Sequence, residues 1–269
     1  MNKLTNYTTE KIFTRLLTNK SSSNWWNYVS ELRKRATEGI FKKSLSLANS
    51  NVITEKEIGL TVLAQFGYPR VHKKEILKFF FKLLERERDR RILSPILYGI
   101  GHSNEKLTIK QINILCTFKT HKSTTVRHAL VFALCTLENA KAIDALIYLS
   151  NDKDSDVRDW ATFGLGTQIE IDNEKIRTAL WDRVSDKDEG PRFEAISGLA
   201  QRRDYRIKNI LTEELERIDE HGSLILEAIE QLEDKTFITL LEKKIIENRK
   251  TRTINEEWLL KTLEKLRAL

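Results

Sequence analysis

Apolar residues recur every third or fourth position in a series of short segments that polar turns separate. In the clearest segment, residues 154–166, Val157, Ala161 and Leu165 are four positions apart and fall on one side of a helix. Asp154 or Asp156 stands near its start, where a short acidic side chain can cap the first turn. The spacing therefore predicts an amphipathic α-helix over residues 154–166.

The same pattern returns at a nearly constant interval. Clear copies lie at residues 123–135 and 188–200, and fainter ones at 55–67, 89–101 and 221–233. The copies end at residues 67, 101, 135, 166, 200 and 233, so neighbouring ends are 31 to 34 residues apart. Further amphipathic stretches lie between them, at residues 74–84, 109–118, 142–149, 174–184, 207–218 and 237–246. The repeating unit is a helix A, a short polar turn and a helix B, and stacked units would build one continuous core.

One segment of this pattern resembles a known repeat family. Residues 154–161, Asp-Ser-Asp-Val-Arg-Asp-Trp-Ala, with Asp152 before them and Leu165 after them, resemble a HEAT repeat of the short kind found in bacterial phycobilisome-lyase-like proteins. The resemblance covers residues 38–250 and is strongest at 121–200. Together with the period it predicts an all-α, right-handed α-solenoid of about six HEAT-like helix pairs. We expect a single domain over residues 1–269, with helical caps at 1–37 and 251–269.

The resemblance also implies a structural role for certain charged residues. In such repeats a turn aspartate and a helix-B arginine form a hydrogen-bonded series between neighbours. In this chain the pattern matches Asp152 with Arg158 and Asp186 with Arg192, while Arg127 has no matching aspartate. We expect these arginines to hold the repeats together; the alternative is a row of anion ligands.

The residues that follow these arginines are predicted to turn away from the core of the three clearest B helices. They are His128, Asp159, Trp160, Phe193 and Glu194. Side by side, they would form an aromatic strip edged with carboxylates, which suits a basic peptide or helix better than DNA. The alternative is that the aromatic side chains fill the seams between neighbouring B helices.

Charge is unevenly distributed along the chain. Residues 1–150 carry 25 Lys and Arg against 12 Asp and Glu, whereas residues 151–269 carry 21 against 27. A polyanion would therefore bind the first half, where Arg33, Lys34 and Arg35 form a basic run. Nucleic-acid binding is the alternative function, and ordinary variation among solvated helices is the other explanation of the charge.

Aromatic residues are concentrated near the N-terminal end. Trp25, Trp26 and Tyr28 lie in a predicted helix before the first repeat. A solenoid needs its terminal face covered, so we expect this cluster to seal the first repeat. An exposed anchor for a partner is the alternative.

The sequence shows no recognisable catalytic or metal-binding motif. The histidines and cysteines lack ligand spacing, and no glycine-rich phosphate loop or nucleophile elbow appears, so we expect no catalytic residues, no cofactor and no metal. The enzyme alternative is a HEAT-like alkylpurine DNA glycosylase using Asp159, Trp160, Trp181 and Glu194. Adjacent helical residues point about 100° apart, and the surrounding sequence is acidic, which argues against that activity. A lyase-like or chaperone-like role is suggested by the resemblance alone.

Two further features bear on location and function. Two cysteines cannot form a disulfide framework, and no apolar run approaches the length of a membrane span, so we expect a cytoplasmic protein without a membrane helix. The function expected is a non-catalytic protein-interaction scaffold or adaptor that binds another protein or peptide on a concave solenoid surface.

Overall fold

The computed structural model describes residues 3–220 and 222–269, and it is helical without a strand over these ranges. His221, the first residue of the sixth predicted repeat copy, lies outside the described residues. The chain divides into two compact units, residues 1–133 and 134–269, each described here by itself.

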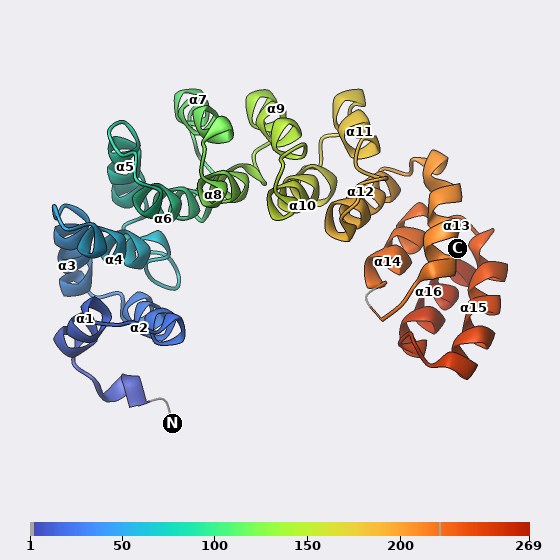
Figure 1. Cartoon of the computed structure of the whole chain (residues 1–269), viewed down its shortest axis with the longest axis horizontal. Coiled ribbons are helices and arrows are strands. Elements are labelled where there is room, and N and C mark those ends of the chain that lie inside the picture. Colours follow the sequence, from blue (N-terminus) through green and yellow to red (C-terminus); the bar gives the residue numbers. More distant parts are fainter. Residues whose placement is uncertain (1–2, 221) are drawn as a thin grey trace. The chain divides into compact units, whose positions relative to one another are not determined.

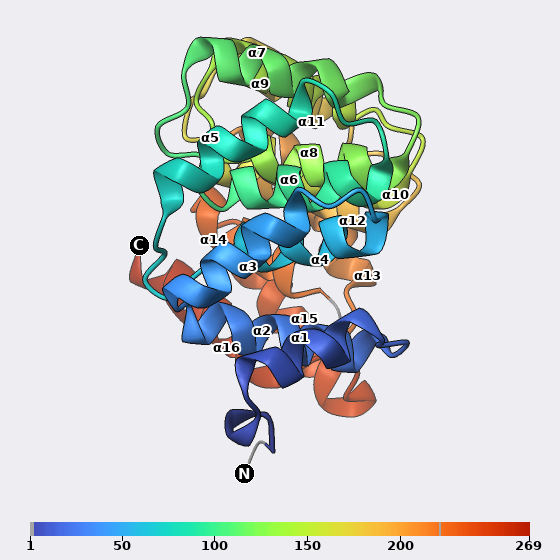
Figure 2. The same cartoon turned by 90° about the vertical axis from the view of Figure 1, so that its left-hand side faces the viewer.

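The first unit is built from eight α-helices, the last of which crosses its boundary by one residue. They are α1 (Thr9–Leu17), α2 (Ser22–Arg35), α3 (Glu38–Ala48), α4 (Ile53–Ala64), α5 (Lys73–Leu84), α6 (Arg90–Gly101), α7 (Ile109–Cys116) and α8 (Thr124–Leu134). Helix α3 packs on α4 and α5 packs on α6, and α4 packs directly on α6 (Figures 1 and 2). The even-numbered helices thus occupy the B position of each pair.

The second unit repeats this arrangement. Its helices are α9 (Ala140–Leu149), α10 (Ser155–Phe163), α11 (Glu174–Trp181), α12 (Glu189–Gln201), α13 (Lys208–Arg217), α14 (Ser223–Leu232), α15 (Phe237–Thr251) and α16 (Glu256–Ala268). The B helices α10, α12, α14 and α16 contact one another in order, and the A helices α9 and α11 pack beside them (Figure 1). Val157, Ala161 and Leu165, which the sequence places on one side of a helix, are buried. The corresponding residues of the two other clear B helices are buried as well: Val126, Leu130, Leu134, Pro191, Ala195 and Leu199.

Helix α10 ends earlier than the sequence predicts. Its regular part stops at Phe163, and residues Gly164–Gln168 form a π-helical turn. A Cβ atom at Gly198 of α12 would lie 2.5 Å from the Cα atom of Gly166, so glycine at both positions lets the two backbones approach. The Arg202 guanidinium covers this turn, donating to the carbonyls of Leu165 and Ile169 at 2.8 Å each.

Both segments expected to be caps contain helices that pack on the neighbouring B helix. Helix α2 contacts α4, and α16 contacts α14. Tyr28 is buried in the core, but Trp26 is 55% exposed. Trp25 is half-buried, and Trp25 and Trp26 line a pocket together with residues of α4 and α6.

Candidate functional site

Three B-helix arginines make the same contact within their own repeat. Each donates from Nη1 to the carbonyl oxygen of the residue six positions before it. For Arg127, Arg158 and Arg192 the acceptors are His121, Asp152 and Asp186, at 2.9, 2.9 and 3.1 Å. The contact ties the start of the B helix to the turn before it, a structural use of these side chains.

Contacts between repeats differ from a simple pairing of each arginine with its own turn aspartate. Arg158 donates to both carboxylate oxygens of Asp186 in the next repeat, at 2.9 and 3.0 Å. Arg192 lies 3.3 Å from the carboxylate of Glu214 instead. The turn aspartate therefore offers its carbonyl to its own repeat, and Asp186 offers its carboxylate to the preceding one.

The predicted partner-binding residues are divided between the two units. His128 belongs to the first unit, where its Nδ1 atom lies 2.8 Å from the Tyr98 hydroxyl. Asp159 and Trp160 lie on α10, and Phe193 and Glu194 lie on α12, so these four belong to the second unit. The structure thus places four of the five residues on neighbouring, contacting B helices.

Three carboxylates extend along the B helices of the second unit: Asp159 on α10, Glu194 on α12 and Glu227 on α14. We call them the acidic row. Within residues 3–220 and 222–269, no hydrogen bond or ion pair reaches their side chains from a cationic group. Burial, with the negative charges of Asp159 and Glu227 beside it, raises the pKa of the Glu194 carboxyl to about 7. Burial and then the charge of Asp156 raise the pKa of Asp159.

The acidic row contrasts with the turn aspartates of the same unit. Hydrogen bonds from the Arg206 side chain hold the pKa of Asp204 far below its usual range despite burial. Bonds from Arg158 and the Asp188 backbone lower the pKa of Asp186, although burial on its own would raise it. Unlike these paired carboxylates, the acidic row carries negative charge that the fold leaves uncompensated.

Aromatic side chains accompany the acidic row. Trp160 is 41% exposed and packs edge-to-face on Phe163, with ring centroids 5.6 Å apart. Phe193 is half-buried, and its ring lies 5.0 Å from the Arg192 guanidinium. Trp181 is on the A helix α11 and donates from Nε1 to Asp204 at 3.1 Å. Trp181 therefore bonds to Asp204 and does not form a common site with Asp159 and Glu194.

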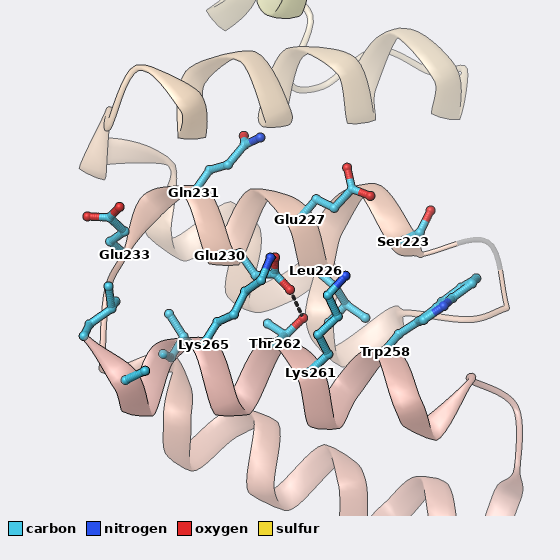
Figure 3. Close-up of a pocket in the computed structure, with 13 residues that line it drawn as sticks. Ser223, Leu226, Glu227, Glu230, Gln231, Glu233, Trp258, Lys261, Thr262 and Lys265 are labelled. Carbon is cyan, nitrogen blue, oxygen red and sulfur yellow. Dashed lines mark hydrogen bonds and ion pairs between the residues drawn. The ribbon is translucent and has the colours of Figure 1, made fainter.

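A groove of about 920 Å³ lies between α14 and α16 and continues from the acidic row. Figure 3 shows Glu227 on α14, with Trp258 and Lys261 on α16 below it. Lys265 pairs with Glu230, which also accepts a hydrogen bond from the Thr262 hydroxyl at 2.7 Å. Neither Glu227 nor this groove was predicted from the sequence. Glu227 lies one repeat length after Glu194, so the repeat period could have identified it.

The basic run is largely engaged within the fold. Arg33 donates to the Thr61 carbonyl and, at 2.9 Å, to Gln65, and burial lowers the pKa of Arg33 to about 10. Arg35 forms an ion pair with Glu31 at 2.8 Å and bonds to the carbonyls of residues 4 and 7. Lys34 is exposed. Two of the three cations named for polyanion binding thus have structural partners.

The described residues contain no cluster of His, Cys, Asp and Glu arranged to hold a metal ion. None of their helices combines the length and the apolar character needed to cross a bilayer.

Known proteins share both the repeats and the fold. A family model for HEAT repeats matches residues 112–200. Protein YibA of Escherichia coli strain K12 is 38% identical over 121 residues, which make up 45% of this chain and 42% of YibA, and YibA of strain O157:H7 gives the same values. The match therefore spans less than half the length of these relatives.

A solved structure extends the likeness in fold to nearly all of the chain. The X-ray structure of YibA from Escherichia coli aligns with 99% of this chain and 94% of its own, with a TM-score of 0.76 and 23% sequence identity. At that identity the likeness concerns the fold. The described ranges are helical without a strand, and residues 112–200 match the model for HEAT repeats, so the fold is an all-α solenoid that contains HEAT-like repeats.

Proposed function

We propose that the protein is a non-catalytic interaction scaffold, and that it binds a positively charged segment of another protein along the acidic row of the second unit. The observation that carries the proposal is the absence of cationic partners for Asp159, Glu194 and Glu227 among the described residues. Asp159 and Glu194 are half-buried, and Glu227 is exposed. Half-buried carboxylates are normally paired, because desolvation disfavours the charged form. A lysine- or arginine-rich segment would supply the missing charge.

The surroundings of the acidic row support a protein partner over a simple counterion. Trp160 and Trp258 are 41% and 39% exposed, and large exposed aromatic side chains are typical anchors in protein interfaces. The groove between α14 and α16 provides a concave place for an apolar side chain of the same partner. Exposed aromatics with an acidic border fit an amphipathic basic helix or peptide.

Nucleic-acid binding through the first half is the weaker alternative. Arg33 and Arg35 already bond to backbone carbonyls and to neighbouring side chains. A cytoplasmic location also belongs to the proposal, since a chain with only two cysteines, Cys116 and Cys135, has too few for a disulfide framework.

The test is partner capture with matched variants. The acidic row is neutralised in Asp159→Asn/Glu194→Gln/Glu227→Gln. The control, Asp182→Asn/Glu216→Gln/Glu264→Gln, removes the same charge from exposed side chains of the second unit. Each immobilised protein is exposed to lysate of its own cells, and bound proteins are identified and then titrated individually.

We expect a basic partner that wild type and the control variant retain and the acidic-row variant loses. Binding should weaken as salt rises, because the attraction is between charges. The proposal is contradicted if both variants retain the partner equally. It is also contradicted if the captured molecule is a nucleic acid that wild type and both variants bind equally.

A further inference from the structure

A pocket of about 430 Å³ lies in the first unit between helices α2, α4 and α6. Two indole rings from α2 and the apolar surface of Ala64 and Pro95 form its walls. Its polar lining includes Gln65, Ser94 and His102. Apolar walls with a few convergent polar groups are the usual composition of a small-ligand site, and this volume is within the usual range. We call it the aromatic pocket.

The hydroxyl group of Ser94, at the pocket, has no hydrogen-bond partner in the described structure. The residue is 7% exposed. Pro95 follows it within α6 and has no N–H, so the helix also lacks the backbone bond from residue 95 to the carbonyl of Arg91. A buried hydroxyl without a partner is unfavourable, and a ligand with a complementary edge would satisfy it.

Gln65 and His102 supply the remaining polar edge. The Gln65 carbonyl accepts from Arg33 Nη1 at 2.9 Å, and its amide nitrogen contacts the His102 ring. Burial, followed by the positive charges of Arg70 and Arg33, lowers the pKa of His102 to about 4. The imidazole is therefore neutral near pH 7, so one ring nitrogen can accept from Gln65 and the other carries a proton that it can donate.

One charged group of the pocket, Glu57, disfavours an anion beside it. The Arg33 guanidinium already donates hydrogen bonds to the Gln65 side chain and to the Thr61 carbonyl. Glu57 also lines the pocket, and no hydrogen bond or ion pair from the described residues reaches its carboxylate. A phosphate or carboxylate placed beside Glu57 would be repelled by this acid.

We propose that the aromatic pocket binds a neutral planar heteroaromatic ring that has both a donor and an acceptor on its edge. The ring contacts the indoles of Trp25 and Trp26, and its edge exchanges hydrogen bonds with Ser94 and His102. The volume accommodates a bicyclic ring of purine size. This site is independent of the acidic row, which belongs to the second unit.

The proposal is tested by titrating the full-length protein with three small probes of known structure. Adenine is the neutral planar probe, adenosine monophosphate adds a charged phosphate, and cyclohexanol has a hydroxyl but no planar ring. Binding is followed by the indole N–H signals of Trp25 and Trp26 in NMR spectra, assigned with Trp25→Phe and Trp26→Phe. We expect saturable shifts of these signals with adenine at a Kd of about 0.1–1 mM, weaker binding of the nucleotide and none of cyclohexanol.

Matched serine variants separate ligand binding from folding. Ser44 Oγ is also buried without a partner in the described structure, but Ser44 lies outside the pocket lining. We expect Ser94→Ala to weaken adenine binding about three- to tenfold with an unchanged or raised Tm, and Ser44→Ala to leave adenine binding unchanged. Trp26→Ala, at an exposed position, should weaken binding about fivefold or more. The proposal is wrong if adenine causes no saturable shift, if cyclohexanol binds equally, or if both serine variants bind like wild type.

Discussion

Arg158 on α10 and Asp186, in the turn before α12, form a buried bidentate ion pair. Arg158 Nε and Nη2 donate to the two carboxylate oxygens at 2.9 and 3.0 Å, and the side chains are 6% and 4% exposed. Asp186 also accepts the backbone N–H of Asp188 at 3.1 Å, just where α12 begins. A single carboxylate thus connects one B helix to the start of the next.

Replacing Asp186 with Ala should destabilise the second unit by about 3 kcal/mol or more. The substitution removes the bidentate partner of the buried Arg158 guanidinium and leaves it only the ion pair with Asp188, whose side chain is 41% exposed; breaking a buried pair in this way is costly. Urea unfolding followed by tryptophan fluorescence in a Trp25→Phe/Trp26→Phe background measures this, because the remaining Trp160, Trp181 and Trp258 all lie in the second unit. The control is Asp144→Ala, whose exposed pair with Lys175 should contribute about 0–1 kcal/mol. Equal losses for the two variants would contradict this account.

Replacing Arg202 with Met should also destabilise the second unit, by about 2 kcal/mol or more. Methionine keeps an apolar stem, but it removes the donors to the carbonyls of Gly166, Gly198, Leu165 and Ile169. Buried carbonyls left without donors carry the full cost of desolvation. Thermal unfolding by circular dichroism provides the measurement, and a Tm equal to that of wild type would show that solvent replaces the guanidinium.

The repeat period predicts the positions of the B helices well. The 3.6-residue apolar pattern within each helix then identifies the face that packs in the core. The repeat period could also have identified Glu227 from Glu194. It could not reveal that Arg202 caps a π-helical turn about 35 residues earlier, since that contact depends on the close approach of Gly166 and Gly198. Nor could it show which acids lack partners, because pairing depends on side-chain positions in neighbouring repeats.

Composition was less informative about the basic run. Arg33, Lys34 and Arg35 are equivalent in a count of charges, but the structure separates them by their partners. Helix α2 turns both arginines toward backbone carbonyls and leaves the lysine exposed. A local sequence cannot distinguish these situations, since the acceptors of Arg33 lie about 30 residues away.

Arg33→Ala should lower stability by about 1.5–3 kcal/mol, because charge-assisted hydrogen bonds to Thr61 and Gln65 are lost. Lys34→Ala should change stability by less than about 0.5 kcal/mol. Urea unfolding monitored by circular dichroism distinguishes the two. If nucleic acid binds this run, Lys34→Ala is the variant that reduces the salt dependence without disturbing the fold. Equal stability losses would mean that the contacts of Arg33 contribute nothing.

Glu194→Gln should stabilise the protein at pH 8 and have no effect near pH 4. The pKa of Glu194 is raised to about 7 in the folded protein, above its unfolded value, so folding favours the protonated side chain. The stability associated with that proton is fully present below the unfolded pKa and is lost as pH rises through about 7. After allowance for solvent screening, we expect glutamine to gain about 1–2 kcal/mol at pH 8. The measurement is the difference in unfolding free energy between variant and wild type from pH 4 to 8; a constant difference would contradict the raised pKa.

The affinity for a basic partner should rise as pH increases from 6 to 8. A cation placed beside Glu194 favours its charged form, so the pKa falls on binding and the complex forms with release of a proton. With a free-protein pKa of about 7, most of the side chain is protonated at pH 6 and charged at pH 8. The affinity gain over this range should be up to about tenfold, measured by calorimetry in two buffers of different ionisation enthalpy. Glu194→Gln should remove most of this dependence while Asp159 and Glu227 still attract the partner. A pH-independent affinity in wild type, or the same slope in the variant, would show that the partner does not contact Glu194.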